Sequence, residues 1–523
     1  MTSDVIVVGA GHNGLVAATL LARAGLTVQV LERAEVVGGA CRTEAPFGKT
    51  PGVRVSSGAY LLGLMPPELI ATLDIDLPLV RRDPHYFLPA RDGRYLLLGG
   101  DRAAARRQFA EFFTEADDRA DEALRAELSA LANDLAPAWL AEPLPVEQTA
   151  ERYIRPQLRD TFVDLVRGSA IDYLSRFGFA SEQVIAMYAV TDGMPGLTGS
   201  PWTPGSGHNM LVHNMCRLPG ADGTWMVVRG GMGTVTRTLA AAATAAGATI
   251  RTGVTVDEIT TAGGAVTGVR ARSTDGPDTD AAEYGASAVL VATDPYRLPA
   301  LLGATCPPEL ADRIDGYARR SGGQTMKVNL ALSDLPRFAA LPQPRGQHGT
   351  TVHLLPEPAA DGSVLTAVRQ GFDAAAAGRL DPLPPVEWYL HSTLDPSLGD
   401  DAGRHSSALF VQGVPHTPAG SDWATEKDGY VRRLLEFVDG YAPGVGDLVD
   451  DVYALAPPDI EAHFGITGGN IFHVDNAISF TDRMPYRTGV AGVYAGAAGC
   501  FPAGSVIGCA GHNAAQAVLA DLR

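Results

Sequence analysis

The chain has 523 residues, a hydrophobic content of 46% and a formal net charge of −18 at pH 7. This length exceeds what one compact core accommodates, so we expect two or three domains. The acidic balance argues against nucleic acid as a partner, because that binding needs a basic face. The five cysteines are scattered without a CxxC pair, which argues against a disulfide framework and favours a reducing compartment. We therefore expect a cytoplasmic protein.

The apolar N-terminal region predicts a strand rather than a targeting or spanning segment. The chain enters this strand directly, without the pattern of a secretory signal. His12, Asn13 and Arg23 interrupt the apolar run of residues 5–30, so no transmembrane segment is predicted. Peripheral membrane contact stays open if the substrate is hydrophobic, and the sequence leaves the homo-oligomeric state open.

The first strand leads into a glycine-rich turn of the kind that binds a dinucleotide. Gly9 allows the tight turn, Gly11 leaves room for a pyrophosphate, and Gly14 lets the next helix pack closely on the strand. That helix, predicted over residues 15–24, offers free N–H groups and the positive end of its dipole to phosphates.

A second apolar run, residues 26–31, predicts the second strand and ends in Glu32. A carboxylate at this position can accept hydrogen bonds from ribose hydroxyls and would repel a 2′-phosphate. The order of strand, turn, helix, strand and acid is therefore complete within the first 32 residues.

A glycine pair, Gly38-Gly39, follows the acid, and two residues separate the pair from Arg42. With these motifs the chain resembles the FAD-dependent amine oxidase and phytoene desaturase superfamily, in which such a pair passes close to the FAD. The spacing before the arginine is similar to that of the phytoene-desaturase-like branch, which includes the group named pyridine nucleotide-disulfide oxidoreductase domain-containing protein 2. The resemblance implies FAD as the cofactor. Since no flavin-linking motif is recognisable, we expect FAD to be bound non-covalently.

A second glycine-rich signature lies near the C-terminus. A strand predicted over residues 490–495 leads through a Gly/Pro-rich turn into a small-residue helix that we expect to begin near Ser505 or Val506. The segment resembles the C-terminal signature of phytoene-desaturase-like proteins. In that superfamily the helix N-terminus points at the flavin N1/C2 carbonyl.

The predicted fold class is α/β. We expect a Rossmann-like FAD-binding domain built from discontinuous segments, residues 1–75, 225–293 and 481–523. The other two segments, residues 76–224 and 294–480, should form an α+β substrate domain with a mixed sheet plus helices. Residues 76–224 carry helical patterning, which is acidic and Arg-rich over residues 102–140. Further patterns predict a loop at 382–385 and strands at 248–251, 254–259, 288–293, 325–332 and 408–412.

The resemblance also assigns the cofactor contacts, including a backbone contact between the adenine and the residues near Val256. The residues predicted to contact FAD are Gly9, Ala10, Gly11, His12, Asn13, Gly14, Glu32, Arg33, Gly38, Gly39, Ala40, Val256, Gly496 and Val506.

Lys327 is one candidate catalytic residue. It lies in an alternating predicted strand that places Met326 and Val328 on the opposite face. The amine oxidases that the chain resembles have a lysine in a similar strand, which reaches toward flavin N5 through a water. The alternative is a solvated lysine at a strand edge.

His213 and Tyr60 are the other two candidates. His208 and His213 could each accept a proton near the flavin. In a helix the two histidines partly share a face, whereas in a strand they face opposite ways. The resemblance favours His213 over His208, and a buried structural histidine is the alternative. Tyr60 follows a segment that in the superfamily enters the cavity beside the flavin, but a packing role is equally compatible with the sequence.

No metal site is predicted. Glu461 and His463, and likewise His473 and Asp475, are neighbouring polar pairs without supporting ligand spacing. A second dinucleotide motif is also missing, so we expect no separate NAD(P)H domain. Electrons should therefore pass to oxygen, a quinone or a carrier.

The sequence favours an FAD-dependent oxidoreductase of the desaturase or dehydrogenase type. It would remove hydride from a carbon of a moderately hydrophobic small molecule and form C=C or C=N. An amine or amino-acid oxidase is the first alternative. It would need an aromatic cage or a carboxylate-binding arginine near the flavin, and the sequence shows neither. The second alternative is an FAD-binding interaction protein without turnover.

Overall fold

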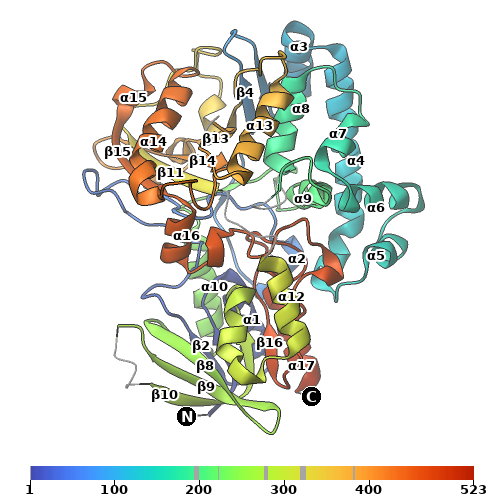
Figure 1. Cartoon of the computed structure of the whole chain (residues 1–523), viewed down its shortest axis with the longest axis vertical. Helices are drawn as coiled ribbons and strands as arrows, with labels where there is room; N and C mark the ends of the chain where they lie inside the picture. The colour runs from blue at the N-terminus through green and yellow to red at the C-terminus, as the bar shows by residue number, and fades with distance from the viewer. Residues whose placement is uncertain are drawn as a thin grey trace.

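The computed structural model describes residues 2–193, 199–221, 223–275, 281–318, 325–380 and 383–522. Two large sheets lie one above the other in Figure 1, and a group of helices stands beside the upper sheet. Both termini lie in the lower part. Residues 383–385 form a loop, as predicted, while Pro382 lies outside the described residues. Within the described ranges, no helix combines the length and apolar character needed to cross a membrane.

The first sheet has the strand order β7-β2-β1-β10-β9-β8, and β16 pairs with β10 beside β9. Strands β7, β2, β1, β10 and β16 run parallel, while β8 and β9 are antiparallel. The central strands are almost wholly apolar because both of their faces are covered. The bounds are β1 (Thr2–Val8), β2 (Val28–Leu31), β7 (Thr249–Arg251), β8 (Val254–Ala262), β9 (Ala265–Ser273), β10 (Ala282–Val291) and β16 (Val493–Ala495).

A row of neighbouring helices packs on this sheet. Helix α1 (His12–Arg23) contacts β1 and β2 and lies between α10 (Gly233–Ala245) and α17 (Cys509–Asp521). Helix α10 contacts β7, and α17 contacts β16. The order of the helices thus follows the order of the strands, and the first and last helices of the chain are neighbours.

The start of the C-terminal helix differs from the prediction. Helix α17 begins at Cys509, not near Ser505 or Val506. Gly508 has φ +84°, a left-handed conformation that an α-helix does not pass through. The preceding residues instead form a tight turn, in which the Ile507 N–H donates to the Ser505 carbonyl. Small residues run on through both parts, so composition could not locate the boundary.

All seven strands of the first sheet come from the three segments predicted to form the FAD-binding domain. The predicted strand at residues 490–495 is shorter in the structure, where β16 begins at Val493. The predicted domain boundaries themselves stay a prediction.

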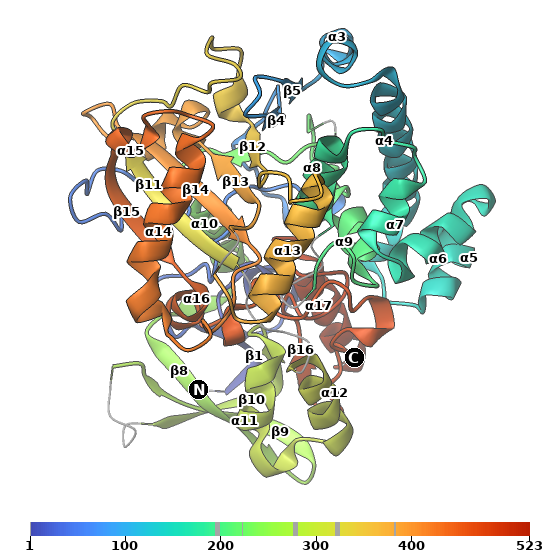
Figure 2. The ribbon, with the colours of Figure 1, turned by 45° about the horizontal axis from the view of Figure 1, so that its top comes forward.

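The second sheet has the strand order β15-β11-β14-β13-β12-β4-β5. Its strands pair antiparallel except for the parallel pair of β12 and β4. One face packs against α14 (Trp423–Asp439), which lies over these strands in Figure 2. The bounds are β4 (Tyr86–Pro89), β5 (Tyr95–Leu98), β11 (Thr325–Leu332), β12 (Thr351–Leu354), β13 (Val386–Tyr389), β14 (His405–Gln412) and β15 (Val449–Leu455).

The remaining elements surround the two sheets. Strands β3 (Leu79–Val80) and β6 (Val227–Val228) form a small pair. The helices are α2 (Pro67–Leu73), α3 (Arg102–Phe112), α4 (Glu115–Leu135), α5 (Val146–Tyr153), α6 (Arg159–Arg167), α7 (Ala170–Ser175), α8 (Glu182–Asp192), α9 (Ser206–His213), α11 (Leu298–Leu302), α12 (Pro308–Ala318), α13 (Val364–Ala376), α15 (Val445–Leu448) and α16 (Pro457–Phe464).

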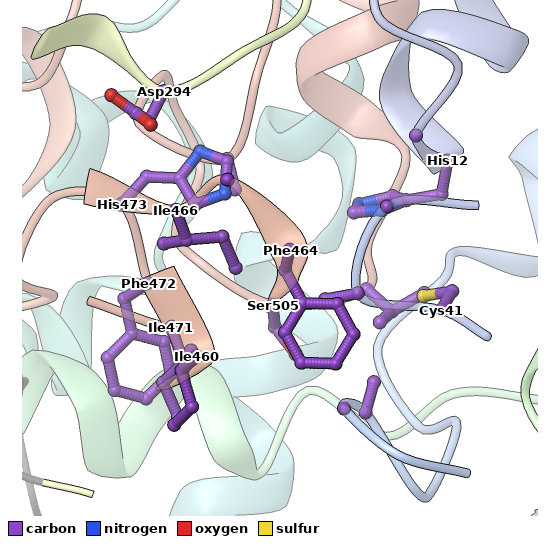
Figure 3. Close-up of a pocket in the computed structure, with 18 of the residues that line it drawn as sticks. His12, Cys41, Asp294, Ile460, Phe464, Ile466, Ile471, Phe472, His473 and Ser505 are labelled. Carbon is purple, nitrogen blue, oxygen red and sulfur yellow. The ribbon is translucent and has the colours of Figure 1, made fainter. Parts of the chain in front are cut away.

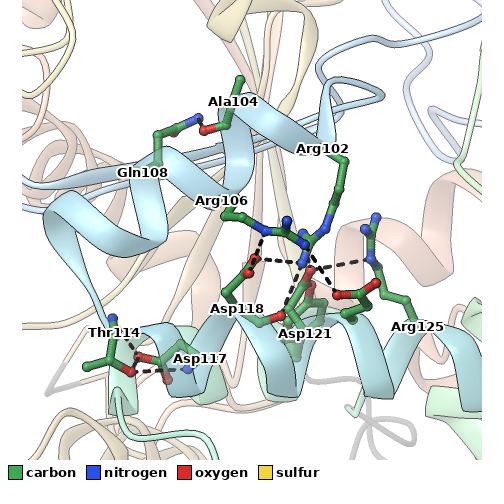
Figure 4. Close-up of polar contacts among 11 residues, drawn as sticks. Arg102, Ala104, Arg106, Gln108, Thr114, Asp117, Asp118, Asp121 and Arg125 are labelled. Atoms are coloured by element: carbon green, nitrogen blue, oxygen red, sulfur yellow. Dashed lines mark hydrogen bonds and ion pairs between the residues drawn. The ribbon is translucent and has the colours of Figure 1, made fainter.

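A buried carboxylate links α3 to α4 in the helical group (Figure 4). Asp121 is fully buried and accepts hydrogen bonds from Arg102 at 2.7 Å and from the Tyr188 hydroxyl. It also forms an ion pair with Arg125 at 3.4 Å. Arg102 also pairs with Asp118 at 2.7 Å. Since each ionised group here has an opposite charge, the cluster can be buried without an unpaired ion.

We expect Asp121→Ala to lower the free energy of unfolding by about 3–5 kcal/mol, because it leaves two arginines and a buried hydroxyl without their shared acceptor. Urea titration of both proteins measures the difference. Arg119→Ala is the matched control, since its ion pair with Glu115 in the same helix is exposed. That control should lose less than about 0.5 kcal/mol. Equal losses in the two variants would contradict the assignment.

Candidate active site

One cavity of about 660 Å³ is lined by residues from both sheets. Its walls include the turn between β1 and α1, strand β8, and the strands β11, β13 and β14. Figure 3 shows polar His12, His473 and Asp294 beside an apolar group that contains Phe464 and Phe472. The cavity therefore joins the predicted dinucleotide motif to the second sheet.

The turn between β1 and α1 shows why glycines are needed. Gly9 has φ +102°. A Cβ on Gly14 would lie 2.1 Å from the Gly9 carbonyl oxygen, so helix and turn touch there. A Cβ on Gly11 would meet no atom within 4 Å, and Gly11 lines the cavity. The open space beside Gly11, at the N-terminus of α1, fits the pyrophosphate of a dinucleotide.

Glu32 lines the same end of the cavity and is buried. One carboxylate oxygen accepts from the Ala10 N–H at 2.7 Å, and the other accepts from the Ala34 N–H at 2.9 Å. Ala10 does not itself line the cavity. Glu32 thus holds the glycine turn in place, a role that the sequence did not reveal, and each oxygen can still accept a further hydrogen bond.

The glycine pair Gly38-Gly39 lies directly beside the turn between β1 and α1. Gly38 and Gly39 have φ +130° and +56°, and the Gly38 N–H donates to the Ala10 carbonyl at 2.9 Å. A Cβ on Gly38 would lie 2.7 Å from the Cys41 carbonyl. Further residues of the predicted cofactor set that line the cavity are His12, Asn13, Arg33, Gly38, Gly39, Ala40, Val256 and Val506.

The C-terminal segment reaches the cavity through Ser505 and Val506, which precede α17. Gly496 and Gly14 do not line the cavity. A Cβ on Gly496 would lie 2.8 Å from the Ala514 Cβ, so this glycine allows α17 to pack on β16. Its contact with FAD stays a prediction.

Two buried nitrogens at this end lack partners among the described residues, His12 Nε2 and His473 Nδ1. Burial, with a smaller contribution from His473, lowers the pKa of His12 to about 4, so its ring is neutral at pH 7. Buried polar atoms normally have hydrogen-bond partners. A polar ligand in the cavity would supply them, and this agrees with the phosphate and ribose groups of FAD.

Lys327 lies in β11 at the other end of the cavity and is only 4% exposed. Its Nζ donates to the Ser56 carbonyl and, at 2.6 Å, to the Gly58 carbonyl, and lies 4.5 Å from the centre of the Tyr60 ring. Met326 and Val328 pack in the hydrophobic core, and Met326 also lines the cavity. Burial lowers the pKa of Lys327 well below its usual 10.5, and an anion placed beside it would favour the charged form.

The strand register places a row of side chains on one face of the second sheet. Lys327 pairs with Phe410, and Phe410 pairs with Glu387. Since neighbouring strands are about 4.8 Å apart, Glu387 lies about 10 Å from Lys327 along this row. All three line the cavity. The sequence had indicated only Lys327, because the other two come from strands that are distant in the chain.

Glu387 belongs to a polar cluster at the far end of the row. Burial raises its pKa to about 7. It accepts a hydrogen bond from the Tyr389 hydroxyl and one from Gln412 at 3.2 Å. Tyr60 lies against Tyr389, with ring centres 4.5 Å apart. Tyr60 therefore lines the cavity as part of an aromatic group with Tyr389 and Phe410.

The two candidate histidines lie in helix α9, which settles the open question of helix or strand. His213 lines the cavity, with Nδ1 3.4 Å from a carboxylate oxygen of Asp192. His208 is buried, and its Nδ1 bonds the Asn476 carbonyl at 2.6 Å. The structure thus brings His213 to the site, while His208 has a structural contact.

The glycine turn, the buried acid and the cavity that continues to the second sheet are the features of a Rossmann-type dinucleotide-binding protein. Residues 14–356 match the family model described as flavin containing amine oxidoreductase, and the chain belongs to this family. It is an FAD-dependent oxidoreductase, and its relatives include a desaturase.

Individual relatives agree with this membership. The chain is 33% identical to pyridine nucleotide-disulfide oxidoreductase domain-containing protein 2 of Mus musculus, over 99% of this chain and 94% of the relative. It is 26% identical to hydroxyneurosporene desaturase of Cereibacter sphaeroides, over 99% and 98%. A solved mutant of putrescine oxidase, 16% identical, shares the fold with a TM-score of 0.60 over 100% of this chain and 99% of that one.

The fit of the N-terminal site is tested by Gly11→Val and Glu32→Ala. We expect Gly11→Val to abolish FAD binding, because its side chain would fill the space beside the helix N-terminus. Glu32→Ala should weaken binding about ten- to a hundredfold, the contribution of a hydrogen bond to a charged group. Flavin fluorescence titration of the apoprotein measures both affinities.

Gly48→Val is the matched control for Gly11→Val. A Cβ on Gly48 would also meet no atom within 4 Å, but Gly48 is exposed and does not line the cavity. The control should bind FAD like the wild type. Wild-type affinity in both site variants would show that the dinucleotide site is misassigned.

The non-covalent attachment of FAD is a separate prediction. Acid precipitation of the purified yellow protein should release free FAD into the supernatant, because no flavin-linking motif is recognisable in the sequence. Flavin that stays with the pellet would instead indicate a covalent bond.

Proposed function

We propose that the protein is a phytoene-desaturase-like dehydrogenase. It would remove hydride from a carbon of a moderately hydrophobic small molecule and form C=C or C=N. The observation that carries this proposal is the continuous cavity, which runs from the dinucleotide turn at Gly11 to an aromatic wall formed by Tyr60, Tyr389 and Phe410. Bound FAD would supply the hydride acceptor.

The residues of the chain would bind and orient FAD and the substrate. The turn at Gly11 and the buried Glu32 would hold the dinucleotide part. The aromatic wall and the apolar residues Phe464 and Phe472 would cover the substrate and exclude water. His213 lies close to Asp192 and is the candidate that would accept a proton from the substrate.

Amine oxidation is the second candidate function. The aromatic group around Tyr60 favours it, since aromatic faces attract ammonium groups. The buried guanidinium of Arg82 in the same cavity disfavours it, because like charges repel. The desaturase relative from Cereibacter sphaeroides, 26% identical, also supports the first proposal.

A substrate screen under anaerobic conditions tests the proposal. Limonene, phytoene and long-chain alkanoates represent hydrophobic substrates, and putrescine and cyclohexylamine represent amines. We expect at least one hydrophobic compound to bleach the flavin absorption band, and oxygen, a quinone or a carrier to restore it. Bleaching by amines alone would favour the second candidate. A flavin that dithionite cannot reduce would favour a binding protein without turnover.

Lys327→Met tests the role of the buried amine. The change nearly preserves side-chain length and removes the group that can carry a positive charge at this wall. Loss of one pre-organised charge typically costs about 10²-fold in rate. We expect one of the two half-reactions, reduction by substrate or reoxidation, to slow by this factor while FAD content stays normal.

Stopped-flow absorption measures the two half-reactions separately. Lys49→Met is the control, since Lys49 is exposed and does not line the cavity. Wild-type rates for Lys327→Met in both half-reactions would make Lys327 a structural residue that holds the loop at Ser56 and Gly58.

A further inference from the structure

Arg82 is a buried cation that lines the cavity, and among the described residues no carboxylate lies in ion-pair contact with it. Its side chain follows β3 and is 2% exposed. Nε donates to the Trp225 carbonyl at 2.8 Å, and Nη1 donates to the Thr351 hydroxyl at 2.8 Å and to the His85 carbonyl at 3.4 Å. All of these acceptors are neutral. In the described part of the chain, Nη2 has no hydrogen bond.

The groups around Arg82 are mostly uncharged. The pKa values of Tyr86 and Tyr389 are raised well above 10 by burial, so both hydroxyls stay protonated. Burial, with a smaller contribution from Arg82, lowers the pKa of His85 and of His353 to about 3, so both rings are neutral. A buried ion normally has a counter-ion. A ligand bound in the cavity can supply this counter-ion, because Arg82 lines the cavity.

We propose that Arg82 binds a carboxylate at one end of an otherwise hydrophobic substrate. The inference rests on the proposed function, because it assigns the polar end of the same substrate. A single guanidinium with one free nitrogen matches the single charge of a carboxylate better than the double charge of a phosphate. The aromatic wall formed by Tyr60, Tyr389 and Phe410 would cover the apolar part. The substrate class is therefore an amphipathic carboxylic acid.

Glu387 makes this binding dependent on pH. Below its pKa of about 7 the side chain is neutral, and above it the side chain becomes an anion in the neighbourhood of Arg82. That anion would compete with a substrate carboxylate. The groups that act on Glu387 from the surrounding elements are Tyr389, Gln412, Thr191, His213, Asp192 and Arg82. Affinity for a carboxylate should thus fall as the pH rises from 6 to 8.

Ligand binding to the FAD-loaded protein tests the proposal. Decanoate, decanamide and decylamine share one chain and differ in charge at its end. Isothermal titration calorimetry and the shift of the flavin absorption band report binding without turnover. We expect decanoate to bind at least about tenfold more tightly than decanamide, as for a hydrogen bond to a charged group. Equal affinities for decanoate and decanamide, or tighter binding of decylamine, would overturn the proposal.

Two variants test whether Arg82 causes the preference for decanoate and whether Glu387 causes its pH dependence. Arg82→Lys should reduce the preference for decanoate over decanamide, and Arg81→Met is the control, because Arg81 is the adjacent arginine and does not line the cavity. Glu387→Gln should keep decanoate affinity constant between pH 6 and 8, where the wild type loses it. Should Arg82→Lys fail to fold, the wild-type comparison and the Glu387→Gln pH profile still decide. An unchanged pH profile in Glu387→Gln would contradict the role of Glu387.

The carboxylate site and the proposed dehydrogenase function can each be contradicted without the other. A protein that prefers decanoate but whose flavin is never bleached by any hydrophobic compound would support the carboxylate site and contradict the dehydrogenase. A protein whose flavin is bleached by a hydrocarbon but that does not prefer decanoate would support the dehydrogenase and contradict the carboxylate site.

Discussion

The close contact between α1 and α17 is the constraint on which the site depends. A Cβ on Gly511 would lie 2.0 Å from the Asn13 carbonyl oxygen, so no side chain fits between these helices. The Asn13 side chain also accepts from the Gly511 N–H at 3.2 Å. Through this contact the last helix fixes the first, and the turns at Gly11 and Val506 come to line one cavity. The FAD-binding sheet therefore needs both ends of the chain.

The pairing register of the strands in the second sheet is a further constraint on the site. Because side chains alternate along a strand, the Lys327 side chain faces the cavity while Val328 packs in the core. A slip of one residue in β11 would exchange these faces. Pairing with β14 and β13 then aligns Phe410 and Glu387 with Lys327. The chemistry of the cavity wall is thus set by strand pairing over more than 50 residues of chain.

Local patterns in the sequence were sufficient for one half of the site. The glycine turn, Glu32 and the strand Thr325–Leu332 were predicted, since each depends on residues that are close together in the chain. The predicted start of α17 was wrong by at least three residues. Gly508 ends the preceding turn in a left-handed conformation, and the run of small residues around it gives no sign of this boundary. The packing of Gly496 on Ala514 was not predicted for a related reason, since Ala514 lies in the following helix.

The other half of the site could not be predicted from the sequence. Arg82 follows β3, whereas Glu387 and Tyr389 lie in β13, about 300 residues further along the chain, and only folding brings these residues to one cavity. An isolated arginine or glutamate in a chain with 41 basic and 59 acidic residues carries no signal of burial. The buried Arg82 and the aromatic group around Tyr60 are therefore visible only in the structure.

A crystal structure of the protein with bound FAD would test the central claim most directly, namely that one cavity joins the dinucleotide turn to the wall of the second sheet. The account predicts that the FAD pyrophosphate lies against Gly11 and that the flavin ring lies toward Lys327. A flavin bound outside this cavity, or a pyrophosphate distant from Gly11, would contradict it.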